Sequence, residues 1–260
     1  MAEESRTLFQ GRVVLITGAG TGIGRGMALA FAREGASIAL AGRRKEPLEA
    51  TAAEIQKLGA KAAVIKTDVS NAADCQTLAL ECVLRLGDLH ILINNAGNAT
   101  FGALDQTADE DISSMLDVNL RGVMLMSKYA IPELIKHRDG SASILNIGTS
   151  AALTVVKNFS VYSSVKAALI HFTNCMALEL AEHRVRVNCI NPGVVETPIF
   201  ETMMPAASIP AAMANFASQT PLGRVGQPQD IADAALFLCS RKASWITGAS
   251  LTVDGGISLT

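Results

Sequence analysis

Seven short apolar runs, separated by longer helical patterns, constrain the fold more than any other feature of this sequence. Each run holds four to six residues and is flanked by glycine or polar turn residues, as buried strands are. The predicted strands are 13–16, 37–41, 62–65, 91–94, 143–147, 185–190 and 250–253. The helical patterns lie near 22–34, 46–58, 71–86, 109–137, 161–183 and 228–239. This alternation predicts a parallel sheet of seven strands with helices on both faces, an α/β fold.

The alternation runs through the whole chain without a linker, low-complexity tract or long repeat. With 49% hydrophobic and 18% charged residues, the chain has ample material for one core. We therefore expect a single domain over 1–260, with 1–10 flexible. The stretch 194–222 is rich in Pro, Met and Ala, and connections of this length are often lids or binding loops. We expect a substrate loop or lid there.

Composition and charge exclude several classes of partner. A net charge of −2 gives no basic footprint for nucleic acid. No run reaches the roughly 18 apolar residues of a membrane span, and the acidic N-terminal residues do not resemble a secretory signal. Five scattered cysteines and four histidines show no metal-ligand spacing, so no metal is expected. The histidines, read as surface or packed residues, are His90, His137, His171 and His183. We expect a cytoplasmic protein that acts on a small molecule.

The first predicted strand leads directly into a glycine-rich turn, TGAGTGIG at 17–24. Glycine is needed where the backbone takes a positive φ or approaches a ligand without a Cβ between them. Such a turn directs the first amides of the next helix outward, where the helix dipole favours a pyrophosphate. A turn without a ligand is the alternative, which its place after the first strand disfavours. The residues predicted to contact a dinucleotide here are Gly18, Gly20, Thr21, Gly22, Ile23 and Gly24.

The end of the second predicted strand indicates which dinucleotide fits. NAD-binding sites carry an acidic residue about 20 residues past the glycine turn, where it accepts the ribose hydroxyls. Here Gly42 is followed by Arg43 and Arg44. Arginine can hold a 2′-phosphate through two parallel hydrogen bonds. We therefore predict NADP(H) rather than NAD(H), with a solvated basic turn as the alternative.

Five motifs follow one another along the chain. They are TGAGTGIG (17–24), NNAG (94–97), Asn119 in LDVNLRG, Tyr162 and Lys166 in YSSVK, and NPG (191–193). In this order and spacing they resemble the single-domain short-chain dehydrogenase/reductases over about residues 10–257. The resemblance implies a Rossmann-type doubly wound domain and a nicotinamide-dependent oxidoreductase. It also implies a homotetramer built from the two longest helices and the C-terminal strand.

Tyr162 and Lys166 stand one helical turn apart, on the same face of a predicted helix. A carbonyl that accepts hydride builds negative charge on its oxygen, which an acid must protonate or stabilise. The ordinary pKa of tyrosine, about 10, is high for this work near neutrality. A cation within a few ångström typically lowers such a pKa by about 1–3 units. We predict that Tyr162 is the general acid/base and that Lys166 acidifies it; by resemblance, Lys166 also holds the nicotinamide ribose.

Two further catalytic positions rest on the resemblance. Asn119 lies inside a predicted helix, where asparagine is unfavourable. The resemblance implies that this residue bends the helix and helps to hold a water that links the lysine to solvent. The family's substrate-orienting serine lies 13 residues before the tyrosine, which is Thr149 in this chain. Ser150 is the alternative if the turn is shifted by one residue.

The resemblance also implies further cofactor contacts. Those expected at the ribose are Asn95, Ala96 and Gly97; at adenine, Asp68 and Val69; at the nicotinamide, Pro192, Gly193, Val195 and Thr197. Each position also suits an ordinary strand-ending turn.

The stretch 194–222 indicates the chemistry of the substrate. Methionines and aliphatic residues suit an adaptable apolar wall, and no lysine or arginine lies between Arg186 and Arg224. We predict a ketone or secondary alcohol with an apolar substituent, unless these residues only pack against the last helix. The alternatives are a β-ketoacyl carrier-protein reductase, a non-catalytic NADP(H)-binding sensor or scaffold, and a nucleotide-sugar enzyme of the extended type.

Overall fold

The computed structural model describes residues 7–260, and its centre is a sheet of seven parallel strands in the order β3-β2-β1-β4-β5-β6-β7. The strands are β1 (Val13–Thr17), β2 (Ser37–Gly42), β3 (Ala62–Lys66), β4 (Ile91–Asn94), β5 (Ser143–Ile147), β6 (Arg186–Pro192) and β7 (Ser250–Val253). Each predicted run is a strand, because continuous apolar side chains suit a sheet that is covered on both faces.

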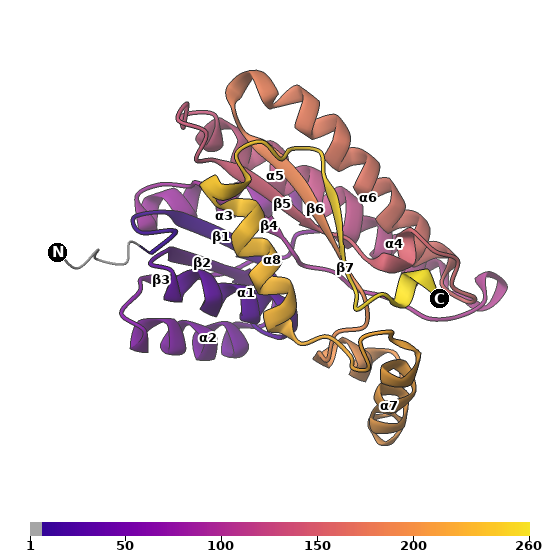
Figure 1. Cartoon of the computed structure of the whole chain (residues 1–260). Coiled ribbons are helices and arrows are strands. Elements are labelled where there is room, and N and C mark those ends of the chain that lie inside the picture. Colours follow the sequence, from indigo (N-terminus) through magenta and orange to yellow (C-terminus); the bar gives the residue numbers. More distant parts are fainter. Residues whose placement is uncertain (1–6) are drawn as a thin grey trace.

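Two layers of helices cover the sheet (Figure 1). The helices are α1 (Gly22–Arg33), α2 (Lys45–Lys57), α3 (Ala72–Leu86), α4 (Asp109–Leu116), α5 (Gly122–Leu134), α6 (Ser160–Glu179), α7 (Ile209–Gln219) and α8 (Pro228–Cys239). One layer contains α1, α2 and α8, and the other contains α3, α5 and α6. A separate apolar core fills the space on each side of the sheet. The doubly wound architecture is therefore confirmed.

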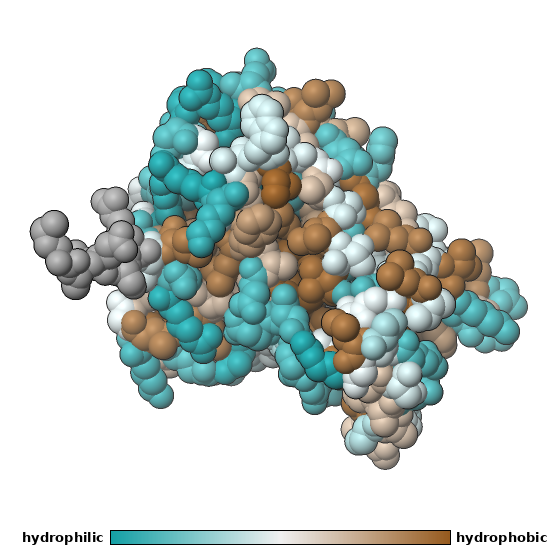
Figure 2. All heavy atoms as spheres, in the orientation of Figure 1, coloured by the Kyte–Doolittle hydropathy of each residue, from teal (hydrophilic) through white to brown (hydrophobic). Residues whose placement is uncertain are grey.

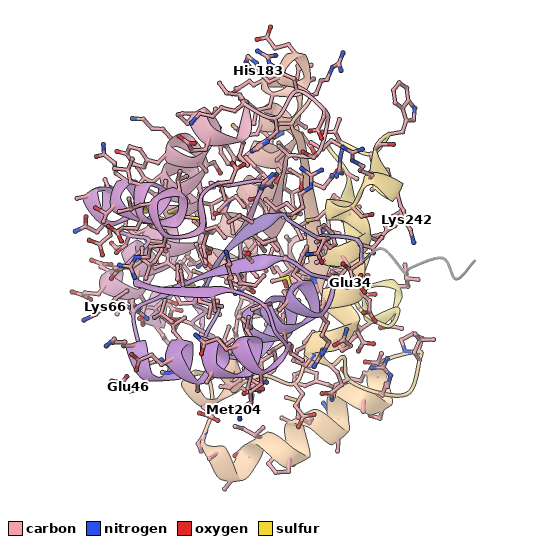
Figure 3. All side chains as sticks on the ribbon, turned by 90° about the vertical axis from the view of Figure 1, so that its left-hand side faces the viewer. Glu34, Glu46, Lys66, His183, Met204 and Lys242 are labelled. Carbon is pink, nitrogen blue, oxygen red and sulfur yellow. The ribbon has the colours of Figure 1, made fainter. Side chains whose placement is uncertain are left out.

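The strand order reverses between β1 and β4, both of which are central in the sheet. In a doubly wound fold, ligands bind in the crevice that this reversal opens outside the carboxyl ends of the strands. Lys66, at the end of β3, and Glu46, at the start of α2, mark that edge on the left of Figure 3. Glu34, after α1, lies at the opposite edge.

The predicted helix over 109–137 is divided by a wider turn. A π-helical segment, Asp117–Arg121, separates α4 from α5. The spacing of Thr107 and Glu110 in the sequence suggests a capping box at the start of this helix, but none forms. The residue before α4 is Ala108, and the Thr107 hydroxyl donates to the Ala103 carbonyl instead, at 2.9 Å.

The stretch 194–222 is not a simple loop, because it contains α7. Ile209, Met213 and Phe216 recur at helical spacing, and the Phe216 ring lies 6.2 Å from that of Phe200. None of the residues of α7 is buried, and the helix extends away from the two layers (Figure 1). In Figure 3, Met204 lies between α7 and the rest of the domain. The segment is thus a helical arm beside the carboxyl edge of the sheet.

The predicted flexible stretch 1–10 falls partly outside the described residues, which begin at Thr7. Within the described part, Phe9 is buried and its ring packs 4.7 Å from that of Phe31. No helix among residues 7–260 is long and apolar enough to cross a membrane.

Candidate active site

The glycine turn between β1 and α1 is shaped by close backbone contacts. Gly18 and Gly22 have φ of +66° and +53°, in the region that favours glycine. A Cβ at Gly24 would lie 2.2 Å from the Gly18 carbonyl oxygen, so no side chain fits there. Thr21 precedes α1 without a capping side-chain hydrogen bond, which leaves the first amides available to an anion. This cradle fits the pyrophosphate of a dinucleotide.

The side chain of Asn95 fastens this turn to the end of β4. Its Nδ2 donates to the carbonyls of Thr17 and Gly18, at 2.9 and 3.2 Å. The backbone amides of Asn95 and Ala96 both donate to the Thr17 hydroxyl at 3.0 Å. The amide nitrogen of Asn95 therefore holds the turn in place, and the contact of Asn95 with the cofactor ribose stays a prediction.

The segment after β6 lies against the glycine turn. A Cβ at Gly22 would lie 3.1 Å from the Cβ of Thr197, so these two residues meet across the crevice. Two residues before Thr197 in the chain, Val195 is buried and its backbone pairs with Gly226. Pro192 ends β6, and a Cβ on the following glycine would collide with Asp254. The predicted nicotinamide contacts thus start at the strand end and reach the turn.

Arg43 and Arg44 are exposed at the end of β2, and Arg43 lies close enough to Asp68 for its charge to act on that carboxyl. Burial raises the pKa of Asp68, but hydrogen bonds from Ser70 and the charge of Arg43 outweigh it and lower that pKa. Arg43 and Ser70 also line an open hollow of about 430 Å³. The other residues around the hollow are Asp109, Glu110, Ser113, Ser114, Asp117 and Val118. Of the predicted adenine and 2′-phosphate contacts, Arg43 lines this hollow, and Asp68 and Val69 directly precede its Ser70 in the sequence.

Tyr162 and Lys166 lie one turn apart near the start of α6. Lys166 is buried, and its Nζ lies 5.9 Å from the Tyr162 ring centroid. The same Nζ donates to the Ile147 carbonyl at the end of β5, 2.8 Å away. A Cβ at Gly97 would lie 3.7 Å from this Nζ and 2.8 Å from Asn119 Oδ1. The ammonium and the asparagine amide therefore converge on Gly97.

The electrostatics of this pair differ from the expectation. Burial raises the pKa of Tyr162 to about 12, and a hydrogen bond with Thr149 opposes this rise. Burial also lowers the pKa of Lys166 to about 8, against the opposing influence of the Cys189 thiol. Burial therefore dominates the pKa of Tyr162 in this arrangement, and the acidification of Tyr162 by Lys166 stays a prediction. Below its pKa, Lys166 still carries its charge.

Thr149, rather than Ser150, is the hydroxyl that hydrogen-bonds with Tyr162. Thr149 has extended backbone angles at the end of β5, and its Oγ1 accepts from the Ala151 amide at 3.3 Å. Ser150 is the first residue of the short 3₁₀ turn that follows, and it is buried. The arrangement therefore favours Thr149 as the residue that orients a substrate.

Asn119 lies at the centre of the π-helical segment and is fully buried. Its Nδ2 donates to the Asn98 carbonyl and side-chain oxygens, at 2.9 and 2.8 Å, and to the Met115 carbonyl at 3.0 Å. Its Oδ1 accepts from the Asn98 amide at 3.3 Å. Single-turn π segments occur frequently at functional sites, and this one turns the asparagine toward the end of NNAG.

Two histidines that are distant in sequence meet beside Asp88, which their spacing did not predict. The rings of His90 and His137 stack 4.1 Å apart, and with Asp88 they offer three ligand atoms within 4.8 Å of one another. However, His90 Nδ1 accepts from the Val13 amide at 3.1 Å. A neutral His90 then carries its proton on Nε2, the atom that would have to bind the metal. We therefore interpret this cluster as packed side chains and not as a metal site. Burial lowers the pKa of His90 to about 4, which agrees with a neutral, packed imidazole.

Two phenylalanines beside the candidate proton donor were also not predicted. Phe159 lies 4.8 Å from Tyr162 and Phe101 lies 5.7 Å from Phe159, measured between ring centroids. They come from separate loops, after β4 and before α6, and no periodic pattern marks them. The only signal in the sequence is that each closely neighbours a motif, NNAG or YSSVK.

Comparison with known proteins assigns this chain to a protein family. A family model described as enoyl-(acyl carrier protein) reductase matches residues 18–258. The chain belongs to the short-chain dehydrogenase/reductase family. The 7alpha-hydroxysteroid dehydrogenase of Escherichia coli is 37% identical, over 95% of this chain and 94% of that protein. The 3-oxoacyl-[acyl-carrier-protein] reductase FabG of Thermotoga maritima is 34% identical, over 95% and 98%.

A solved structure supports the same assignment. The 3-ketoacyl-(acyl-carrier-protein) reductase of Brucella melitensis, complexed with NADH, has a TM-score of 0.87 and 34% identity, covering 96% of this chain and 99% of that chain. The chain is thus an oxidoreductase of a short-chain dehydrogenase/reductase family whose members bind nicotinamide cofactors.

Proposed function

We propose that this protein transfers a hydride between NADP(H) and a ketone or secondary alcohol that bears an apolar substituent. The observation that carries the proposal is the convergence of Lys166 and Asn119 on Gly97, next to Tyr162 and its hydrogen bond with Thr149. A protein that only binds a dinucleotide needs the glycine turn but no proton donor. The buried ammonium, which burial disfavours, is best explained by a catalytic role.

The chain offers a place for each part of the cofactor. The amides at the start of α1 would hold the pyrophosphate, Gly97 and Lys166 the nicotinamide ribose, and Thr197 the carboxamide. When bound, the nicotinamide supplies the hydride and, in its oxidised form, a positive charge. Tyr162 gives a proton to the carbonyl oxygen in reduction and takes one back in oxidation. Thr149 holds that oxygen beside the phenol, and Lys166 stabilises the phenolate.

The preference for NADP(H) is supported by the end of β2. Arg43 and Arg44 are both exposed there, and Gly42 stands where a carboxylate would accept ribose hydroxyls. Asp68 lies close enough to Arg43 to be influenced by its charge, and it fixes its own orientation through Ser70. An exposed guanidinium beside the hollow is available to a 2′-phosphate.

An apolar substrate is supported by the surface around the site. Large apolar side chains are exposed on the loops after β4 and β5; they include Phe101, Leu153, Val155 and Val156. In Figure 2, hydrophobic residues gather over the C-terminal segment and the loops beside it. Two relatives are named for ring alcohols: the hydroxysteroid dehydrogenase and the 2,5-dichloro-2,5-cyclohexadiene-1,4-diol dehydrogenase LinX of Sphingobium indicum, which is 36% identical.

A β-ketoacyl carrier-protein reductase is the second candidate, which the similarity to such enzymes favours. A carrier-bound substrate brings the phosphate of its pantetheine arm to the mouth of the site. The segment between Arg186 and Arg224 offers that phosphate no cation, whereas Lys157 is exposed on the loop before α6. If the protein is a β-ketoacyl carrier-protein reductase, Lys157→Glu lowers kcat/KM for a carrier-bound ketoacyl substrate and leaves kcat/KM for free ketones unchanged.

A homotetramer is proposed from the exposed apolar residues of the long helices and the last strand. Those residues are Leu116, Met124, Leu178 and Leu251. Sedimentation velocity at several concentrations tests this assembly.

The function is tested by turnover of a panel of ketones and secondary alcohols with NADPH, NADH and their oxidised forms. The proposal predicts turnover of apolar ketones and a higher kcat/KM with NADPH. Cofactor binding without turnover of the panel would favour the sensor, and equal or better efficiency with NADH would refute the cofactor preference. Binding is followed by NADPH fluorescence, because Trp245 is 98% exposed and lies near the amino end of β6, at the edge opposite the site.

A further inference from the structure

Three aromatic rings form a continuous row that ends at the candidate proton donor. The Phe101 and Phe159 centroids are 5.7 Å apart, and those of Phe159 and Tyr162 are 4.8 Å apart. The rings are tilted to one another by 57° and 41°, and such separations lie in the range in which aromatic pairs attract. The row therefore extends from the loop after β4 to the first turn of α6.

A backbone contact holds the two loops of this row together. The Gly102 amide donates to the Asn158 carbonyl at 2.9 Å, next to Phe101 on one side and Phe159 on the other. Asn158 has a φ of +64°, a left-handed conformation that asparagine tolerates better than most residues. Backbone conformations of this kind gather at ligand-binding sites. The sharp turn at Asn158 delivers Phe159 to its place between the other two rings.

The outer end of the row is open. Phe101 is 52% exposed, although burying a phenylalanine side chain is strongly favourable. On the other loop, Val155 is fully exposed, at 102%. Apolar surface left open beside candidate catalytic groups is typical of a ligand contact. At the inner end, Phe159 limits the tilt of the Tyr162 ring and hence the direction of its hydroxyl.

We infer that Phe101 and Phe159 determine specificity, and that they favour ketones whose carbonyl is attached to a ring over open-chain ketones of the same carbon number. The inference rests on the proposed function. A ring presents a broad face to Phe101, flat when it is aromatic, and loses little conformational freedom on binding. An open chain must restrict the rotation of several bonds to cover the same surface, so it gains less binding free energy from contact with Phe101 and Phe159.

Three methyl ketones of equal carbon number test the inference: acetophenone, cyclohexyl methyl ketone and 2-octanone. Wild type is expected to show a higher kcat/KM for the two ring ketones. Phe101→Leu keeps the site apolar but removes the aromatic face, so it lowers the ratio of ring to open-chain efficiency by about threefold to tenfold. Phe159→Leu lowers the same ratio and also kcat for every ketone, because Tyr162 loses its neighbour.

Leu104→Ala is the matched control, since Leu104 is exposed on the same loop but lies outside the row. It is expected to leave the ratio unchanged. An unchanged ratio in Phe101→Leu, or an equal loss in Leu104→Ala, would overturn the inference. If wild type turns over no ketone, the proposed function fails, and calorimetric binding of acetophenone and 2-octanone to the NADP⁺-loaded protein decides the inference instead. A preference for acetophenone that Phe101→Leu abolishes supports it, and the absence of a preference refutes it.

Discussion

Replacing Lys166 by methionine removes a charge that the fold buries at a cost. Lys166 is only 4% exposed, and burial lowers its pKa from 10.5 to about 8. Between these two pH values the unfolded chain binds more protons than the folded chain, so the free energy of unfolding rises with pH. Below pH 8 the cost is fully present, and at 1.36 kcal/mol per pKa unit it amounts to about 3 kcal/mol at pH 7. Methionine keeps most of the length of the side chain without the charge.

Urea unfolding of the cofactor-free protein at pH 7 and pH 9.5 measures this cost. The stability that Lys166→Met gains over wild type should be about 2 kcal/mol larger at pH 7 than at pH 9.5. Charged and neutral lysine both donate the hydrogen bond to Ile147, so Lys166→Met loses this bond at both pH values. The difference between the two pH values therefore does not contain this loss. Lys242→Met, at an exposed position, should show no such difference. Equal behaviour of Lys166→Met and Lys242→Met would refute the claim that Lys166 is a buried charge.

Further predictions concern the substrate hydroxyl and the glycine turn. Thr149→Val should lower kcat by about 10²-fold or more, because Thr149 hydrogen-bonds with Tyr162. Ser150→Ala should leave kcat nearly unchanged. Steady-state kinetics measures both effects, and a large loss of kcat in Ser150→Ala alone would assign the substrate-orienting role to Ser150. Gly24→Ala should abolish NADPH binding in a fluorescence titration, because its Cβ would lie 2.2 Å from the Gly18 carbonyl oxygen. Retained binding would show that the turn adapts.

The strands could be predicted from sequence because a sheet covered on both faces needs continuous apolar runs. The glycine turn was predictable for a related reason, since positive φ at Gly18 and Gly22 leaves a visible signature. The helix α7 was not predicted, because methionine and proline in 194–222 suggested a loop. The apolar residues of α7 do follow a helical period, but none of the residues of this helix is buried, so it is not a core helix.

The site was predicted in its parts but not in its energetics. Spacing places Lys166 one turn after Tyr162, yet it says nothing of the burial that raises the pKa of the phenol to about 12. The pairing of Phe101 with Phe159 depends on two loops that meet through Gly102 and Asn158. Such contacts join residues that are far apart in the chain, and no local pattern encodes them.

The most direct test of the central claim, that Tyr162 exchanges the proton with the substrate oxygen, is the effect of Tyr162→Phe on ketone reduction. The substitution removes only the hydroxyl and keeps the ring that packs on Phe159. It should lower kcat/KM for reduction with NADPH by at least about 10²-fold, with the Kd for NADPH unchanged. Undiminished turnover by Tyr162→Phe would contradict the account.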